Sequence, residues 1–259
     1  MLKLYDNAFS PFARKIRLAL DHKELDYDVV DGLKKSNHGQ LAAVNPRIEV
    51  PCLQDGDITV VNSSDIIGHL EYRFPDRPVY PEEAGVRVRA RAWERTADTL
   101  VDSILTDISY WSWTGRTDPM PDGLFGAAQT DLDAVFDQLE RDLQTGPFIC
   151  GALSIADLAF FPHMTGLRTL RIGLSSERHP RVLQWFKTMR GMDLFKADMQ
   201  RTHDYMQNFD PQEIETGRIF WRGDRIEWIL AKGYHDWFLG EIKAERVIWP
   251  GLSLPPGNN

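Results

Sequence analysis

The 259-residue sequence contains only two cysteines and no long hydrophobic run. Two cysteines are too few for a disulfide framework or for a Cys₄ zinc site. No apolar stretch reaches the roughly 18 residues that a membrane span needs, and residues 1–5 (MLKLY) lack the apolar core of a signal peptide. We therefore expect a soluble protein of the cytoplasm that does not associate with membranes.

An excess of basic residues is also missing. Lys and Arg number 30 and Asp and Glu 38, which gives a net charge of −8 and argues against nucleic acid as a partner. The basic run at 87–91 (RVRAR) is predicted to be a solvated helix face, and Lys15 and Arg17 are predicted to be solvated helix charges. The seven histidines show no metal-ligand spacing, so no metal site is expected.

Short strands and helices alternate over the first eighty residues. Period-two and helical spacing of apolar residues, with a turn at Asp55-Gly56, predict the elements. The expected strands are 2–5, 25–30, 50–53 and 58–61, and the expected helices are 13–22 and 63–74. The order β-α-β followed by β-β-α is typical of a small mixed sheet with helices packed against it. It predicts an α/β domain over residues 1–80.

Prolines cluster at residues 75–81, and strand patterns end there, which predicts a domain boundary. Long amphipathic helical patterns follow over residues 82–207, so the second domain is predicted to be all-α. Its helices are expected at 84–109, 125–143, from 154 and from 180. Residues 208–259 form a tryptophan-rich C-terminal extension. A lid or a partner surface are alternatives, but we expect it to pack on the body, because exposed tryptophans would form an adhesive patch.

Ser10, followed by Pro11, is the first candidate for chemistry. Serine is a preferred helix N-cap, and proline is favoured at the first helical position. Ser10 is either a simple cap or part of an anion site at the helix N-terminus. If the anion is a thiolate, a charge-assisted hydrogen bond and the helix end together would lower the thiol pKa by roughly one to three units. Taken alone, the Ser-Pro pair favours simple capping.

Two further segments, each taken alone, also allow either a structural or a ligand-binding interpretation. Val50-Pro51 begins a predicted strand. It is either an ordinary trans proline or a cis proline that turns the Val50 backbone outward, toward a peptide-like ligand. Asn62 and Ser63 are good helix caps, and they also offer the groups that suit a carboxylate ligand.

In combination, these segments resemble the cytosolic glutathione S-transferase family. Residues 10–20 (SPFARKIRLAL) are similar to the active-site turn and first helix of its serine and cysteine classes. Residues 45–53 (NPRIEVPCL) are similar to the segment that carries the family's cis-proline, and residues 151–157 (GALSIAD) resemble its helix-start motif. In that motif Ser154 and Asp157 would form a structural capping box. The pattern is closest to the zeta, tau, omega-like and bacterial classes.

The resemblance implies a thioredoxin-like N-terminal domain, with a mixed four-stranded sheet and helices, followed by an all-α helical-bundle C-terminal domain. It implies a glutathione transferase, a detoxification enzyme that uses glutathione as co-substrate and no metal, and that forms a homodimer. Ser10 would be the catalytic residue that stabilises the glutathione thiolate, and Tyr5 is its rival in that role. The glutathione-binding residues would be Ser10, Phe12, Glu49, Val50, Pro51, Asn62 and Ser63, and Phe12, Tyr110, Trp111 and Trp113 would line a pocket for a hydrophobic electrophile between the domains.

Serine at position 10 has a mechanistic consequence. Unlike cysteine, it cannot form a mixed disulfide with glutathione, so glutathione itself is the nucleophile. Cys52 and Cys150 are expected to be buried, inert thiols. Asn62 stands where the family usually has an acidic residue, which leaves a non-enzymatic scaffold with the same fold as one alternative. A glutathione-dependent isomerase and a thioether-cleaving enzyme are the others.

Overall fold

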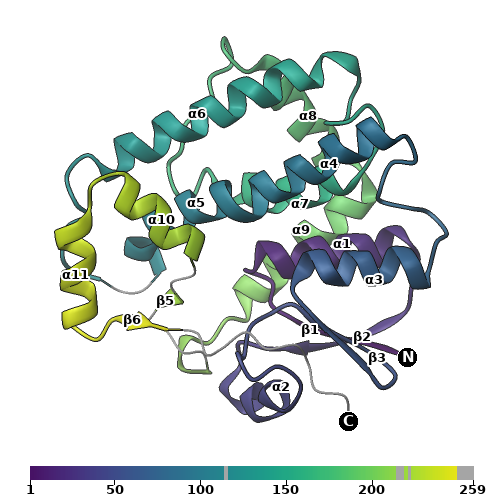
Figure 1. Cartoon of the computed structure of the whole chain (residues 1–259), viewed down its shortest axis with the longest axis horizontal. Helices are drawn as coiled ribbons and strands as arrows, with labels where there is room; N and C mark the ends of the chain where they lie inside the picture. Colours follow the sequence, from purple (N-terminus) through teal and green to yellow (C-terminus); the bar gives the residue numbers. More distant parts are fainter. Residues whose placement is uncertain (114–115, 214–218, 221–222, 250–259) are drawn as a thin grey trace. The chain divides into compact units, whose positions relative to one another are not determined.

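The computed structural model of the chain describes residues 1–113, 116–213, 219–220 and 223–249 (Figure 1). The chain divides into two compact units. The first unit contains residues 1–81 and 190–213, and the second contains 82–189 and the described residues of 219–249. No helix in these ranges is long and apolar enough to cross a membrane.

The first unit is built on a mixed four-stranded sheet with the strand order β2-β1-β3-β4. Its strands are β1 (Leu2–Asp6), β2 (Tyr27–Asp31), β3 (Cys52–Asp55) and β4 (Ile58–Val61). β1 runs parallel to β2 and antiparallel to β3, and β3 and β4 form the hairpin predicted at Asp55-Gly56. The predicted thioredoxin-like sheet is confirmed.

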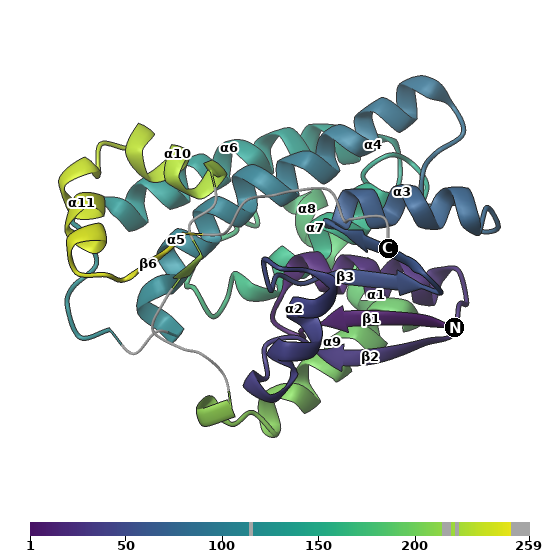
Figure 2. The ribbon, with the colours of Figure 1, turned by 60° about the horizontal axis from the view of Figure 1, so that its bottom comes forward.

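Helices cover both faces of this sheet. α1 (Pro11–His22) and α3 (Ser63–Arg73) lie on one face and α2 (His38–Val44) on the other (Figures 1 and 2). On the α2 side, Tyr5, Leu41 and Cys52 form a buried cluster. α2 had no counterpart among the predicted elements, because its short sequence (HGQLAAV) has too few apolar residues to show a helical period.

A late helix completes the first unit. α9 (Asp193–Gln207) packs against α1 and belongs to the first unit, although it falls within the predicted helical domain, 82–207. Its buried carboxylate, Asp198, accepts hydrogen bonds from Arg14 and Arg17. The prediction that Lys15 and Arg17 are solvated was wrong: their exposed fractions are 0% and 4%. α1 is covered by the sheet on one side and by α9 on another, so charges on its outer faces become buried.

Residues 82–189 of the second unit are helical with connecting loops, as predicted. Its main helices are α4 (Ala84–Thr96), α5 (Asp102–Trp113), α6 (Leu124–Asp142), α7 (Ile155–Gly166) and α8 (Pro180–Gly191). A π-helical stretch, Ala97–Val101, joins α4 to α5, so the helix predicted at 84–109 is one continuous run. Short 3₁₀ turns occur at Lys35–Asn37, Leu143–Thr145 and Pro211–Glu213. The arginines of the 87–91 run are exposed, as predicted.

The capping box at the start of α7 is present. The Ser154 N–H donates to Asp157 Oδ2 at 3.0 Å, and Asp157 Oδ1 accepts from the Ile149 N–H at 3.0 Å and from Trp185 Nε1 at 2.8 Å. Asp157 is fully buried. The motif therefore stabilises the start of α7 and links it to α8, a structural role like the one expected.

The described residues of the C-terminal extension from 219 onward pack on the second unit, whereas residues 208–213 belong to the first. The residues from 219 onward contain α10 (Gly223–Ala231), α11 (His235–Lys243) and two short parallel strands, β5 (Ile219–Phe220) and β6 (Val247–Ile248). α10 packs against α5, where Arg225 forms a 2.9 Å ion pair with Asp102. Trp228, which is buried, donates from Nε1 to Asp131 at 2.9 Å. Packing on the body is thus the arrangement found for these residues.

Candidate active site

The three predicted segments lie at one end of the four-stranded sheet. β1 ends at Asp6 and leads to Ser10, β3 begins just after Pro51, and β4 ends just before Asn62. Tyr5 is paired with Cys52, and Cys52 is paired with Val61. Because paired residues sit side by side across a sheet, the chain leaves or enters all three strands at the same end. The register therefore brings Ser10, Val50-Pro51 and Asn62-Ser63 to the same end of the sheet.

Ser10 is the N-cap of α1. Its Oγ accepts a hydrogen bond from the Ala13 N–H at 3.3 Å, and its side chain is half-buried. No described residue accepts from the hydroxyl, so its O–H remains available to a ligand. The positive end of the helix dipole lies at the same place, which favours a negative charge there.

Val50 and Pro51 are joined by a cis peptide bond, one of the two alternatives left open by the sequence. Val50 packs tightly against Gly32, which follows β2. A Cβ atom added at Gly32 would lie 2.4 Å from Val50 Cγ1. Gly32 is therefore required for the position of Val50, and sequence reasoning did not single it out.

The segment before Val50 is held by its own side chains. Asn45 Nδ2 donates to the Glu49 carbonyl oxygen at 2.9 Å, and Arg47 Nε forms a 2.7 Å ion pair with the Glu49 carboxylate. Ile48, between them, has a φ of 53°. The Glu49 carboxylate predicted to bind glutathione is thus already paired with Arg47.

Asn62 is the N-cap of α3, with a φ of 73°. Asparagine is among the residues that adopt this left-handed conformation most readily. Its Oδ1 accepts from the Ser64 N–H at 3.0 Å, while Ser63 is buried at the first position of the helix. Asn62 itself is exposed. The helix start thus presents an amide side chain and backbone N–H groups, which suit a carboxylate.

Tyr5, the rival to Ser10, is a packed strand residue. It is 1% exposed, and its hydroxyl donates to Gln54 Oε1 at 3.1 Å. Burial raises the pKa of its phenol. The Tyr5 hydroxyl is therefore already engaged within the sheet.

Both cysteines are free. Burial raises the pKa of the Cys52 thiol to about 12 and that of the half-buried Cys150 thiol to about 11. Thiols that hold their protons at neutral pH are poor nucleophiles, in line with the inert character expected. Among the described residues, no group of three His, Cys, Asp or Glu side chains could hold a metal ion.

The predicted electrophile-pocket residues occupy different environments. Phe12 is half-buried on α1, and Tyr110 is fully buried on α5. Trp111 is half-buried, with its ring centroid 5.5 Å from that of Trp237 in α11. The side chain of Trp113 lies outside the described residues. A pocket formed by these residues stays a prediction.

Arg116 was not singled out by sequence reasoning. Its guanidinium lies 4.4 Å from the Tyr110 ring centroid and 5.1 Å from that of Trp111. Only the fold brings it, Tyr110 and Trp237 together, because their positions in the chain carry no common motif.

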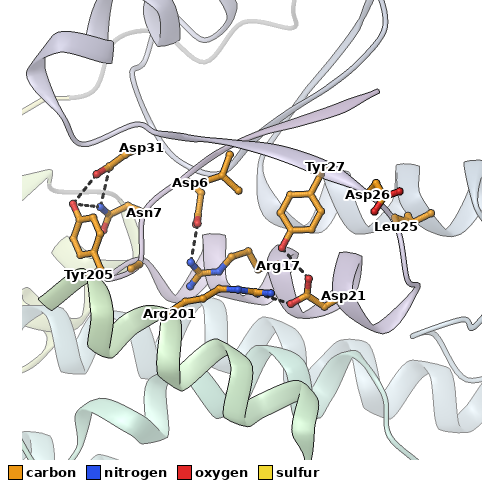
Figure 3. A pocket seen from close by; sticks show the side chains of 12 residues that line it. Asp6, Asn7, Arg17, Asp21, Leu25, Asp26, Tyr27, Asp31, Arg201 and Tyr205 are labelled. Atoms are coloured by element: carbon orange, nitrogen blue, oxygen red, sulfur yellow. Dashed lines mark hydrogen bonds and ion pairs between the residues drawn. The ribbon is translucent and has the colours of Figure 1, made fainter. Parts of the chain in front are cut away.

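A cavity of about 490 Å³ opens in the first unit beside β1, β2, α1 and α9 (Figure 3). Its described lining does not include Ser10, Val50 or Asn62. It is bordered instead by hydrogen-bonded polar side chains, namely Asp6 with Arg17, Asp21 with Tyr27 and Arg201, and Asn7 with Asp31 and Tyr205. The last of these sets, Asn7 with Asp31 and Tyr205, lies beside the turn that leads to Ser10.

Comparison with known proteins places the chain in a family. The family description "Glutathione S-transferase, N-terminal domain" matches residues 4–78, and "Glutathione S-transferase, C-terminal domain" matches residues 122–188. The chain belongs to the glutathione S-transferase family.

Curated relatives agree with this assignment, and a solved structure shares the fold. Maleylacetoacetate isomerase of Rattus norvegicus is 26% identical over 224 residues, which cover 82% of this chain and 97% of that protein. A zeta class glutathione S-transferase of Euphorbia esula is 28% identical over 207 residues, covering 76% and 89%. The structure of human glutathione S-transferase T1-1 in its apo form superposes with a TM-score of 0.68 at 22% identity, covering 89% of this chain and 99% of that one.

Proposed function

We propose that this glutathione-dependent enzyme is a glutathione transferase in which Ser10 stabilises the thiolate of bound glutathione. The observation that carries the proposal is the meeting of Ser10, Val50-Pro51 and Asn62-Ser63 at one end of the sheet. Each segment offers polar groups suited to a different part of a peptide-like ligand with a carboxylate at one end.

The sulfur of glutathione would lie against the N-terminus of α1. The Ser10 hydroxyl donates to it, and the helix dipole adds to the stabilisation of its negative charge. The thiol gives its proton to solvent. The thiolate then forms a bond to an electrophilic carbon of a hydrophobic compound, and the leaving group departs with the electron pair of the bond that breaks.

The remainder of glutathione would lie along this end of the sheet. The Val50 backbone pairs with the cysteinyl residue, and Asn62 and Ser63 hold the γ-glutamyl carboxylate. The neutral amide of Asn62 cannot form an ion pair with the α-amino group, so we expect weaker binding than an acidic residue would give. Glu49 has a smaller role, because Arg47 already occupies its carboxylate.

An ultraviolet titration of bound glutathione tests the proposal. Thiolate absorbance should persist well below the pKa of the free thiol, and Ser10→Ala should raise the apparent pKa by about one unit or more. Ser10→Thr, which keeps a hydroxyl and a capping oxygen, should restore most of the shift. An unchanged pKa in Ser10→Ala would remove Ser10 from the mechanism, and absence of glutathione binding would favour the non-enzymatic scaffold.

A glutathione-dependent isomerase is the second candidate, favoured by the likeness to maleylacetoacetate isomerase over most of both chains. An isomerase returns glutathione unchanged, whereas a transferase consumes it. Conversion of maleylacetoacetate without loss of free thiol would favour the isomerase. The homodimer, the cytoplasmic location, the electrophile pocket and the domain boundaries at 80, 82, 207 and 208 stay predictions.

A further inference from the structure

Asn7 fixes the turn that presents Ser10. Its Oδ1 accepts from the Phe9 N–H at 2.8 Å, and its carbonyl oxygen accepts from the Ser10 N–H at 3.0 Å. Asn7 is 2% exposed. Side chain and backbone of one residue thus determine the path of residues 7–10, and with it the starting point of α1.

Asn7 is in turn held by two residues from distant parts of the sequence. Its Nδ2 donates to Asp31 Oδ1 at 3.1 Å and to the Tyr205 hydroxyl oxygen at 2.9 Å. Tyr205 closes the triangle by donating from its hydroxyl to Asp31 Oδ2 at 2.8 Å (Figure 3). Burial, followed by the bond to Asp31, raises the pKa of Tyr205, so the phenol stays a donor at neutral pH.

α9 and the residues just after it also reach the same turn through aromatic contacts. The Phe9 ring meets the Tyr205 ring edge-on with centroids 5.1 Å apart, and it meets the Phe209 ring at 5.3 Å. A phenylalanine at position 205 would keep the ring contact and lose the hydroxyl. The two contributions can therefore be separated by one substitution.

We propose that Tyr205 and Asp31 are positioning residues that act through Asn7 to hold the Ser10 hydroxyl in the geometry that stabilises the glutathione thiolate. This inference rests on the proposed function. Loss of the Tyr205 hydroxyl removes one of the two acceptors of Asn7 Nδ2 and the hydroxyl that donates to Asp31 Oδ2. Asn7 then no longer has a single arrangement, and Ser10 is less well placed.

The test is the apparent pKa of the thiol of bound glutathione in Tyr205→Phe. We expect it to rise by about half to one unit, and kcat/KM near neutral pH to fall about three- to tenfold. The affinity for S-methylglutathione, which has no ionisable thiol, should change less than twofold. A merely structural role would lower Tm without moving the thiol pKa.

Tyr27→Phe is the matched control. The Tyr27 hydroxyl also donates to an aspartate, Asp21, at 2.9 Å, and burial likewise raises the pKa of its phenol. Asp21 lies near the end of α1 that is remote from Ser10 in sequence. We expect Tyr27→Phe to leave the thiol pKa within about 0.2 units of wild type.

A double-mutant cycle decides whether Tyr205 acts through Ser10. In the Ser10→Ala background, Tyr205→Phe should cause no further rise in the thiol pKa. An undiminished rise in that background, or a wild-type pKa in the single Tyr205→Phe variant, would overturn the inference. If wild-type protein binds glutathione with an ordinary thiol pKa, or does not bind it, the proposed function itself fails.

Discussion

Arg14 and Asp198, 184 residues apart in the sequence, form a doubly hydrogen-bonded ion pair inside the first unit. Arg14 donates to Asp198 Oδ2 from Nη2 at 2.6 Å and from Nε at 3.1 Å, and Arg17 adds a bond to Oδ1 at 3.1 Å. The Asp198 side chain is fully buried and those of both arginines are 5% exposed. This network joins α9 to the helix that carries Ser10 at its start.

We predict that Asp198→Asn lowers the free energy of unfolding by about 3–5 kcal/mol, because it leaves two buried guanidinium groups without their shared carboxylate. Asp193→Asn, on the same helix, is the control. The Asp193 side chain is fully exposed and pairs with Lys196, so its replacement should leave the denaturation midpoint nearly unchanged. Urea denaturation of both variants measures the difference, and equal costs would contradict the burial argument.

Gly32→Ala should disturb the Val50 segment directly. The added Cβ would lie 2.4 Å from Val50 Cγ1 and 3.1 Å from Leu41 Cδ2. We expect a loss of about 1–3 kcal/mol in stability, because the packed side chains must move. Since Val50 is proposed to pair with glutathione, affinity should also fall about two- to tenfold. Calorimetric titration with glutathione measures the second effect.

Gly39→Ala in α2 is the matched control for Gly32→Ala. A Cβ there meets nothing within 4 Å, and alanine favours helix by up to about 1 kcal/mol. Stability should stay the same or rise, and glutathione affinity should not change. If both variants bound glutathione equally well, Val50 would have no role in binding.

Asp107 should make stability depend on pH. It is 1% exposed, and neither carboxyl oxygen has a hydrogen-bond partner among the described residues. Burial, opposed by Arg225, raises its pKa well above the ordinary value. The folded protein then holds the proton more tightly than the unfolded chain, so this group's contribution to stability falls as pH rises above the ordinary aspartate range.

Asparagine resembles the protonated acid and does not titrate. Asp107→Asn should therefore gain stability relative to wild type as pH rises from about 4 to about 7, as measured by thermal unfolding across that range. Asp102→Asn, on the same helix, removes the buried partner of Arg225, so that variant should be destabilised at neutral pH. A difference between Asp107→Asn and wild type that does not vary with pH would contradict the prediction.

Glu241 should anchor α11 to the second unit. Its side chain is 2% exposed and accepts from Arg116 at 2.6 and 3.1 Å and from Arg246 at 3.0 and 2.6 Å. We expect Glu241→Gln to cost about 1.5–3 kcal/mol and to speed amide hydrogen exchange in α11. Glu227→Gln, at an exposed position of α10, should leave exchange unchanged. Protection of α11 equal to wild type would contradict the anchoring role.

Features set by neighbouring residues were predictable from the sequence. The β3-β4 hairpin follows from Asp55-Gly56, the cap of α1 from Ser10-Pro11, and the Ser154 capping box from its motif. Each depends on local turn or helix chemistry, which is encoded within a few residues. The helical period also places the start of α8 at Pro180, as observed.

Features set by distant residues were not predictable. In the sequence, Arg17 has the spacing of a surface charge. It becomes buried in an ion pair because α9 brings Asp198 against it. Tyr205 lies 198 residues from Asn7, and no spacing rule connects them. The Asn7 turn had a local signal, because asparagine often accepts from the backbone two residues later, but its partners come from the fold alone.

The membership of α9 in the first unit has a consequence for biosynthesis. While the ribosome is still making the helical unit, the nascent N-terminal segment has neither Asp198 nor Tyr205 to contact. Arg14 and Arg17 would then have to remain hydrated, and the turn at Asn7 would lack its restraint. The N-terminal portion can reach its final form only after the codons for α9 have been translated, even though ordinary domains fold in the order of their synthesis.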